Sequence, residues 1–387
     1  MQKEFVISIE LFSDLLRVST LAIIPEQKTI VLQKSWEAPN NRETQAVVSD
    51  LLRQAQKSLP PKTDFHLIIN LHPGLATTIH SGTGIIRPEN EKPITETELD
   101  QIIASALWKI FTTQRARAAT ILQIHPGESV LVDVEVLNIL LDGHKVMNPV
   151  EFKARAAEVW CQETIAQKEI IELLVATVDA KKIVAINESA GQIARMVSGK
   201  YSQYVFAYCG TTQMTLYWIS EDKITARQTI NWGVHAYKAA LMRELHLNDF
   251  EANEIISQYQ NQNLSKKVQK EIHELLVGEL AFFLNGLALQ YHQKKFSAVY
   301  IYTEERPPVQ INDRALLKRM EIPFAVHICN AQSISEKNKF AVQLEESEKK
   351  NKKQFDSALI SVIAAYTRYP GANLKTIAQR RSRWLQA

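Results

Sequence analysis

The sequence has few cysteines, and the three that it has lie far apart. Cys161, Cys209 and Cys329 form no Cys-x-x-Cys pair and are odd in number. This pattern argues against a disulfide framework and against a structural zinc site. It favours a reducing compartment.

The chain also lacks an excess of charge of either sign. Its 45 lysines and arginines nearly balance 42 aspartates and glutamates, which gives a formal net charge of +3. The balance excludes binding of nucleic acid through bulk charge alone, and we expect no nucleic-acid partner. The 387 residues, 45% hydrophobic and 22% charged, are typical of a soluble globular protein of two or three domains.

Several signals of activity and location are missing. The sequence has no Gly-x-Ser-x-Gly elbow, no Walker phosphate loop and no His-x-x-x-His pair, so we expect neither these hydrolase classes nor a metal site. Residues 1–10 alternate apolar and polar positions and do not resemble a secretion signal. Residues 275–289 are apolar but contain Glu279 and Asn285, which favours a buried helix over a membrane span. We therefore expect a cytoplasmic protein.

Two similar β-meanders lie about 200 residues apart. The first is predicted at residues 5–9, 16–24 and 29–33, and it precedes a helix over 43–58 and a strand over 65–71. The second is predicted at residues 204–208, 213–219 and 224–230. Such a repeat indicates a duplicated domain.

The segment between the meanders predicts a unit of its own. After an extended stretch over 77–86, Thr95 and Glu98 have the spacing of a capping box, which predicts a helix that ends near residue 111. Further elements follow: strands at 120–123, 129–141 and 155–161, and a helix at 166–174. A short strand and then a helix are predicted within residues 183–197. Beyond the second meander we predict helices at 233–245, 250–259 and 268–290, a strand at 298–302 and a helix at 357–366.

Duplicated sheets with an inserted segment resemble the actin-like ATPase superfamily. The insertion, with His72-Pro73-Gly74, then residues 93–100, then Gly143 to Val150, resembles FtsA, a bacterial actin relative under the membrane that recruits division proteins. The pilus-assembly protein PilM shares this fold and fits the first strand about as well. The resemblance implies an α/β protein with two β-β-β-α-β-α-β, ribonuclease-H-like halves and an FtsA-type inserted subdomain.

The resemblance also implies domain boundaries. The first half would comprise residues 1–80 and 166–200, with the inserted subdomain at 81–165. The second half would comprise 201–238 and 295–371, with a helical subdomain at 239–294. A basic amphipathic tail would occupy residues 372–387.

Nucleotide binding in this superfamily depends on turns that here have lost their usual residues. Glycines let backbone N–H groups approach the phosphates, and acidic residues hold Mg²⁺. The first turn keeps an acid as Glu10, but Phe12 replaces the glycine before Ser13. The second turn keeps one glycine, in Gly210-Thr211-Thr212, and has Tyr208 and Thr215 in place of its two acids.

The remaining two nucleotide elements are altered as well. Glu304 and Glu305 stand where the third turn of the superfamily has glycines. Asn253 and Ile256 replace the Glu and Lys that lie near ribose and base in relatives. Loss of all four elements implies a pseudo-ATPase with no catalytic residues and no cofactor. The alternative is an unusual switch that binds ATP with magnesium, in which Glu10 handles the metal and Thr211 and Thr212 the phosphate.

The basic tail is a second candidate site. On a helix, one face would gather its apolar residues, while its basic residues would mostly point elsewhere, as in an interfacial amphipathic helix. Its candidate membrane or partner contacts are Leu374, Ile377, Arg380, Arg383, Trp384 and Leu385. A helix packed on its own domain and a merely solvated end remain open.

The resemblance therefore predicts a non-catalytic scaffold that recruits or tethers division proteins at the inner face of the cytoplasmic membrane. A PilM-like component of type IV pilus assembly and the ATP-dependent switch are the alternatives. The partners would be proteins of either machinery, with self-association and peripheral membrane contact also open. An unrelated α/β protein is a third reading, which a missing subdomain at 85–165 would support.

Overall fold

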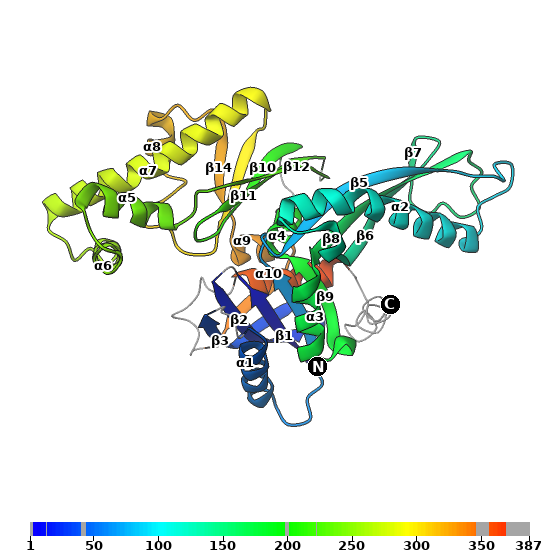
Figure 1. Cartoon of the computed structure of the whole chain (residues 1–387), viewed down its shortest axis with the longest axis horizontal. Coiled ribbons are helices and arrows are strands. Elements are labelled where there is room, and N and C mark those ends of the chain that lie inside the picture. Colours follow the sequence, from blue (N-terminus) through cyan, green and yellow to red (C-terminus); the bar gives the residue numbers. More distant parts are fainter. Residues whose placement is uncertain are drawn as a thin grey trace. The chain divides into compact units, whose positions relative to one another are not determined.

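The computed structural model describes residues 3–12, 14–39, 44–197, 201–221, 223–345 and 356–368. The chain divides into two compact units (Figure 1). Unit 1 comprises Met1–Ile193, Ser335–Lys350 and Ser357–Ala387, and unit 2 comprises Ala194–Ile334 and Asn351–Asp356.

Unit 1 is built on a six-stranded sheet in the order β15-β3-β2-β1-β4-β9. Its strands are β1 (Glu4–Leu11), β2 (Leu15–Ile24), β3 (Thr29–Pro39), β4 (His66–Leu71), β9 (Ile183–Glu188) and β15 (Ala341–Leu344). Alternate residues of β1, such as Ile7 and Ile9, face α1 (Thr44–Ser58) and α3 (Lys168–Thr177) in one apolar core. On the other face, Asn70 of β4 donates to Ser8 of β1 and to Ser361 of α10 (Asp356–Arg368), each at 3.1 Å.

Unit 2 repeats this plan with a five-stranded sheet in the order β12-β11-β10-β13-β14. Its strands are β10 (Gln203–Cys209), β11 (Met214–Ser220), β12 (Lys223–Ile230), β13 (Ala298–Thr303) and β14 (Ala325–Ile328). In both units an antiparallel meander is followed by a strand parallel to the first strand, β4 beside β1 and β13 beside β10. The duplication predicted from the sequence is confirmed by this shared order.

Helices of unit 2 pack on one another and on that sheet. They are α5 (His235–Leu245), α6 (Asp249–Gln260), α7 (Lys266–Gln293) and α8 (Arg314–Arg319), while α4 (Ser189–Met196) and α9 (Ala331–Lys337) lie at the unit boundaries. Helix α7 is long and apolar enough to cross a membrane, but length and composition alone are weak evidence for a membrane span, because the core helix of a soluble protein has the same properties. Its residues Leu276, Leu280 and Leu284 are buried in the core of unit 2, as the sequence predicted for this stretch.

A separate four-stranded sheet lies within unit 1, in the order β5-β8-β6-β7. It comprises β5 (Ala76–Ile86), β6 (Ser129–Leu141), β7 (His144–Val146) and β8 (Ala156–Gln167), and α2 (Glu96–Leu122) packs on it. The Thr95 hydroxyl caps α2 by accepting the Glu98 N–H at 3.2 Å. Glu98 in turn accepts two hydrogen bonds from Arg87, whose side chain is fully buried. Residues 76–167 therefore form a sheet and helix of their own, which speaks against the unrelated α/β fold.

Three expectations about the elements are wrong. Residues 120–123 are not a strand, because α2 continues to Leu122 and buries Ala118 and Leu122 on its core-facing side. The strand predicted at 155–161 ends six residues too early, and the helix predicted at 166–174 begins two residues before α3. Strand β8 runs to Gln167 because residues 162–167 pair with β5 and β6 on both sides.

The predicted boundary of the second half is wrong as well. We assigned residues 295–371 to it, but β15 pairs in parallel with β3, with Ala341 beside Thr29. Helix α10 covers the first sheet through Ser361. Residues 335–345 and 357–368 therefore belong to unit 1.

Candidate functional site

The first candidate turn joins β1 to β2 in unit 1 and is filled by Phe12. This side chain is only 5% exposed, and its backbone N–H donates to Leu15 O at 2.9 Å. The Arg17 guanidinium lies 5.1 Å from the centre of the Phe12 ring. Position 12 therefore packs a large ring where the superfamily has a glycine. Ser13 lies outside the described residues.

Glu10 lies on β1 opposite Arg17 of β2 and is 1% exposed. Arg17 Nη1 is 3.6 Å from Glu10 Oε2, and Arg17 Nε donates to Glu37 Oε1 at 2.6 Å. Burial raises the pKa of the Glu10 carboxyl, and the nearby Arg17 charge opposes that rise. Arg17 thus offsets part of the cost of burying Glu10, while neither carboxyl oxygen of Glu10 has a hydrogen-bond partner among the described residues.

The second candidate turn joins β10 to β11 in unit 2. The Gly210 N–H donates to Gln213 O at 2.9 Å, which closes the turn. The carbonyls of Gly210 and Thr211 accept the N–H groups of Val234 (3.1 Å) and His235 (2.8 Å) at the start of α5. These N–H groups at a helix start, a favourable place for a phosphate, are used within the protein.

Gly233 permits this contact, and the sequence analysis missed its role. A Cβ atom at position 233 would lie 2.5 Å from Thr211 O and 2.6 Å from Gly210 O. Real Cβ atoms do not approach backbone oxygens so closely, so only glycine fits. A glycine between a strand and a helix is the only signal that the sequence offered.

The third candidate turn follows β13 and lies beside the second, because Cys209 pairs with Thr303. The Tyr208 hydroxyl donates to Glu304 Oε1 at 2.7 Å, and the Glu304 N–H donates to Cys209 O at 3.0 Å. Glu305 is exposed. Burial raises the pKa of the Cys209 thiol, as expected for a packed cysteine and not for a nucleophile.

The structure places Gly210, Thr211, Thr212, Glu304 and Glu305 on two neighbouring turns of unit 2. Glu10 and Phe12 lie together in unit 1. Among the described residues, no three His, Cys, Asp or Glu side chains are grouped as a metal ion would need. The tail residues Leu374, Ile377, Arg380, Arg383, Trp384 and Leu385 lie outside the described part of the chain.

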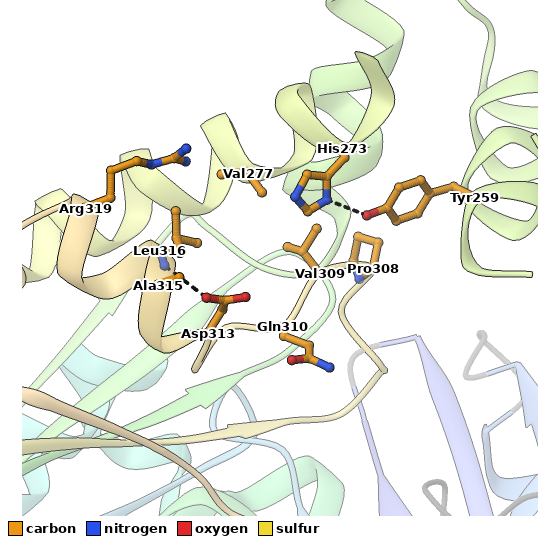
Figure 2. Close-up of a pocket in the computed structure, with 10 residues that line it drawn as sticks. All are labelled: Tyr259, His273, Val277, Pro308, Val309, Gln310, Asp313, Ala315, Leu316 and Arg319. Atoms are coloured by element: carbon orange, nitrogen blue, oxygen red, sulfur yellow. Dashed lines mark hydrogen bonds between the residues drawn. The ribbon is translucent and has the colours of Figure 1, made fainter. Parts of the chain in front are cut away.

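Unit 2 also contains a cavity of about 410 Å³ just after the third turn (Figure 2). Its lining comes from α6, α7, the segment after β13 and α8, with residues Tyr259, His273, Val277, Pro308, Val309, Gln310, Asp313, Ala315, Leu316 and Arg319. Tyr259 Oη and His273 Nδ1 share a hydrogen bond of 2.7 Å, and Asp313 accepts the Leu316 N–H at 3.0 Å. The cavity offers room for a small ligand, with Gln310, Asp313 and Arg319 among the polar side chains of its lining.

Known structures resemble this chain in fold. The PilM–PilN type IV pilus biogenesis complex matches with a TM-score of 0.55 and 14% sequence identity, over 94% of this chain and 98% of that chain. Lower TM-scores of 0.40, each at 9% identity, are found for two further proteins. One is the ethanolamine utilization protein EutJ from Carboxydothermus hydrogenoformans, over 94% of this chain and 91% of that one. The other is a Bacteroides thetaiotaomicron protein with an actin-like ATPase fold, over 93% and 96%.

No protein-family model matches the sequence, and no curated protein matches it either. The duplicated sheets together with the PilM–PilN likeness establish an actin-like ATPase fold. The fold class predicted from the sequence is therefore confirmed.

Proposed function

We propose that this chain is a non-catalytic scaffold, an actin-like protein that acts through its surfaces and no longer uses ATP. The observation that carries the proposal is that groups of each candidate turn already contact other residues of the same unit. Glu10 is paired with Arg17, the Gly210 carbonyl is bound by the start of α5, and Glu304 accepts from Tyr208. A phosphate or a magnesium ion would have to displace these contacts before it could bind.

Titration of the full chain with Mg·ATP tests this proposal. We expect no heat in calorimetry up to millimolar dissociation constants, where binding is worth about 4 kcal/mol. We also expect no change in melting temperature, whereas a ligand at about 100 times its dissociation constant would stabilise the fold by about 2.7 kcal/mol. Stoichiometric binding would refute the proposal and favour the ATP-dependent switch.

The partner of such a scaffold would be a protein. The PilM–PilN complex is a pilus biogenesis assembly of similar fold, and by analogy we propose a cytoplasmic role beside a pilus-type assembly protein. Because 14% identity supports fold alone, the division role drawn from the FtsA resemblance stays a hypothesis. Peripheral membrane contact through residues 372–387 is part of the same proposal.

Affinity capture from bacterial extract, with quantitative mass spectrometry, separates these roles. Enrichment of pilus-assembly proteins would support the first role, and enrichment of division proteins would support the second. Repeating the capture with a chain that lacks residues 372–387 tests the tail. Loss of membrane proteins from that sample alone would assign the contact to the tail, and an unchanged set would exclude it.

A further inference from the structure

The four-stranded sheet of unit 1 has one covered face and one open face. Helix α2 packs on the face that carries Ile85 and Val159. On the opposite face, Ile86 at the end of β5 is 79% exposed. We define this outer face by residues that alternate with the covered ones on β5, β6 and β8, namely Gly82, Gly84, Ile86, Leu140, Glu158 and Trp160.

The outer face is shallow where β5 carries its two glycines. A Cβ atom at Gly82 would lie 2.7 Å from two atoms of the Trp160 ring, so the indole covers the backbone of β5 at this position. Gly84 is exposed, and a Cβ atom there would meet no atom within 4 Å. Trp160 and Leu140 are half-buried. Since no side chain projects at positions 82 and 84, another segment can approach this strand closely.

The last described helix ends on the same side of this sheet. Arg368, at the end of α10, pairs with Asp133 of β6, and its Nε lies 3.3 Å from Glu135 Oε2. Asp133 lies opposite Thr164 of β8, which shares its face of the strand with Trp160. The chain that follows Arg368 therefore starts at one end of the outer face.

The length of the remaining chain matches this surface. From Asp133 to Leu140 the sheet extends along β6 for about 23 Å. A helix over residues 374–387 would be about 21 Å long. Residues 369–373, which include Pro370 and Gly371, are enough to connect Arg368 to such a helix.

We propose that residues 372–387 bind the outer face of their own chain as a helix. On a helix the apolar residues of this tail gather on one side, and that side would cover Trp160, Leu140 and Ile86. Lys145 and Glu158 lie on either side of Leu140. We therefore assign the contact to the apolar residues and not to charge.

This contact goes beyond the proposed function, because it gives the tail a binding site on its own chain. The tail is also the candidate membrane contact, so a tail bound to the sheet would be withheld from a membrane until it is released. Labelling of the purified chain, without lipid, nucleotide or partner, tests the contact separately from the proposed function.

The reactivity of Gly84→Cys measures whether the outer face is covered. All three native cysteines are buried, so the introduced thiol is the accessible one. We expect a maleimide to label it about tenfold faster when residues 372–387 are deleted, which corresponds to a tail bound in roughly nine of ten chains. Trp108→Cys is the matched control, because Trp108 is 73% exposed on α2, on the other side of the same sheet. Its labelling rate should not depend on the tail, and equal rates for Gly84→Cys in the two chains would overturn the proposal.

A change within the tail tests which side of the helix makes the contact. In the full chain, Trp384→Glu should raise the labelling rate of Gly84→Cys towards that of the shortened chain, because it places a charge against an apolar surface. Gln379→Glu adds the same charge on the opposite side of the helix and should leave the rate unchanged. Equal effects of the two variants would overturn the helical contact.

The dependence on protein concentration separates this contact from cover by a second copy. Protection of Gly84→Cys by its own tail should be the same between about 1 and 100 μM, because binding within one chain does not follow mass action. Protection that grows with concentration, or that persists without residues 372–387, would assign the cover to a second copy and would contradict the proposal.

Discussion

Glu163 on β8 is an acidic side chain buried without a charged partner, and it makes the stability of unit 1 depend on pH. The side chain is 0% exposed, and within the described residues neither carboxyl oxygen has a hydrogen-bond partner. On β8, Glu163 shares one face of the strand with Cys161 and Ile165, which belong to the apolar clusters that pack against α2. Burial alone raises the pKa of Glu163 to about 8.

The sign of the pH dependence follows from this shift. In the unfolded chain the carboxyl has a pKa near 4.3, so between that value and pH 8 the folded state holds one more proton. The free energy of unfolding then falls as pH rises, by about 1.4 kcal/mol per pH unit. From pH 5 to pH 8 the free energy of unfolding would fall by about 4 kcal/mol at most. Below pH 4 the stabilisation from the protonated Glu163 is fully retained.

Glu163→Gln removes the titration while keeping the shape of the side chain. We expect the variant to match the wild type near pH 5 and to exceed it at pH 8, by up to 4 kcal/mol, roughly 8 °C or more in the melting of unit 1. Calorimetric melting at pH 5, 6, 7 and 8 measures the difference. Glu158→Gln is the control, because Glu158 lies on the same strand but is only half-buried and accepts from Trp160.

The reasoning fails if the difference between Glu163→Gln and wild type is the same at every pH. It also fails if Glu158→Gln produces the same trend, because the pH dependence would then belong to the strand or to the whole unit. Glu163→Leu should stabilise the protein at pH 8 as well, since it removes the buried polar group altogether.

Two further variants test the packing of each unit. Gly233→Ala should destabilise unit 2 by about 2 kcal/mol, because its Cβ would collide with two backbone oxygens of the second turn. Gly286→Ala, in open space on α7, should stabilise unit 2 by up to about 1 kcal/mol. Urea unfolding measures the free energy of unfolding of both variants. Arg368→Gln should cost about 3 kcal/mol, because it leaves Asp133, 8% exposed, without the guanidinium that pairs with it. Adding Asp133→Asn should recover most of that loss, and a double variant no more stable than Arg368→Gln alone would contradict this account.

The fold could be predicted where apolar residues recur at the regular spacing of a strand or a helix. Strands β10, β11 and β12 were expected within a few residues of their bounds, since each alternates toward one core. Strand β15 has only four residues and is defined by its pairing with β3, more than 300 positions earlier in the sequence. A pairing at that separation leaves no local signal.

Polar residues inside apolar elements caused the other errors. The predicted strand ended at Cys161, just before the polar run Gln162-Glu163-Thr164. In the structure these residues are buried between β5 and β6, and Thr164 approaches Thr78. The sequence analysis also did not predict that Glu163 is buried. Nothing in the sequence around a glutamate distinguishes a buried carboxyl from an exposed one.

The candidate site was predictable in its residues but not in its contacts. Glu10, Gly210 and Glu304 lie at or next to strand ends, as the sequence predicted, because a strand end is a local feature. What each residue does there depends on a partner elsewhere in its unit, such as Arg17, the start of α5 or Tyr208. The sequence shows which residues stand at each turn, but not what they contact. In the structure, groups of each turn contact other residues of the same unit, so we expect each unit to fold without a nucleotide.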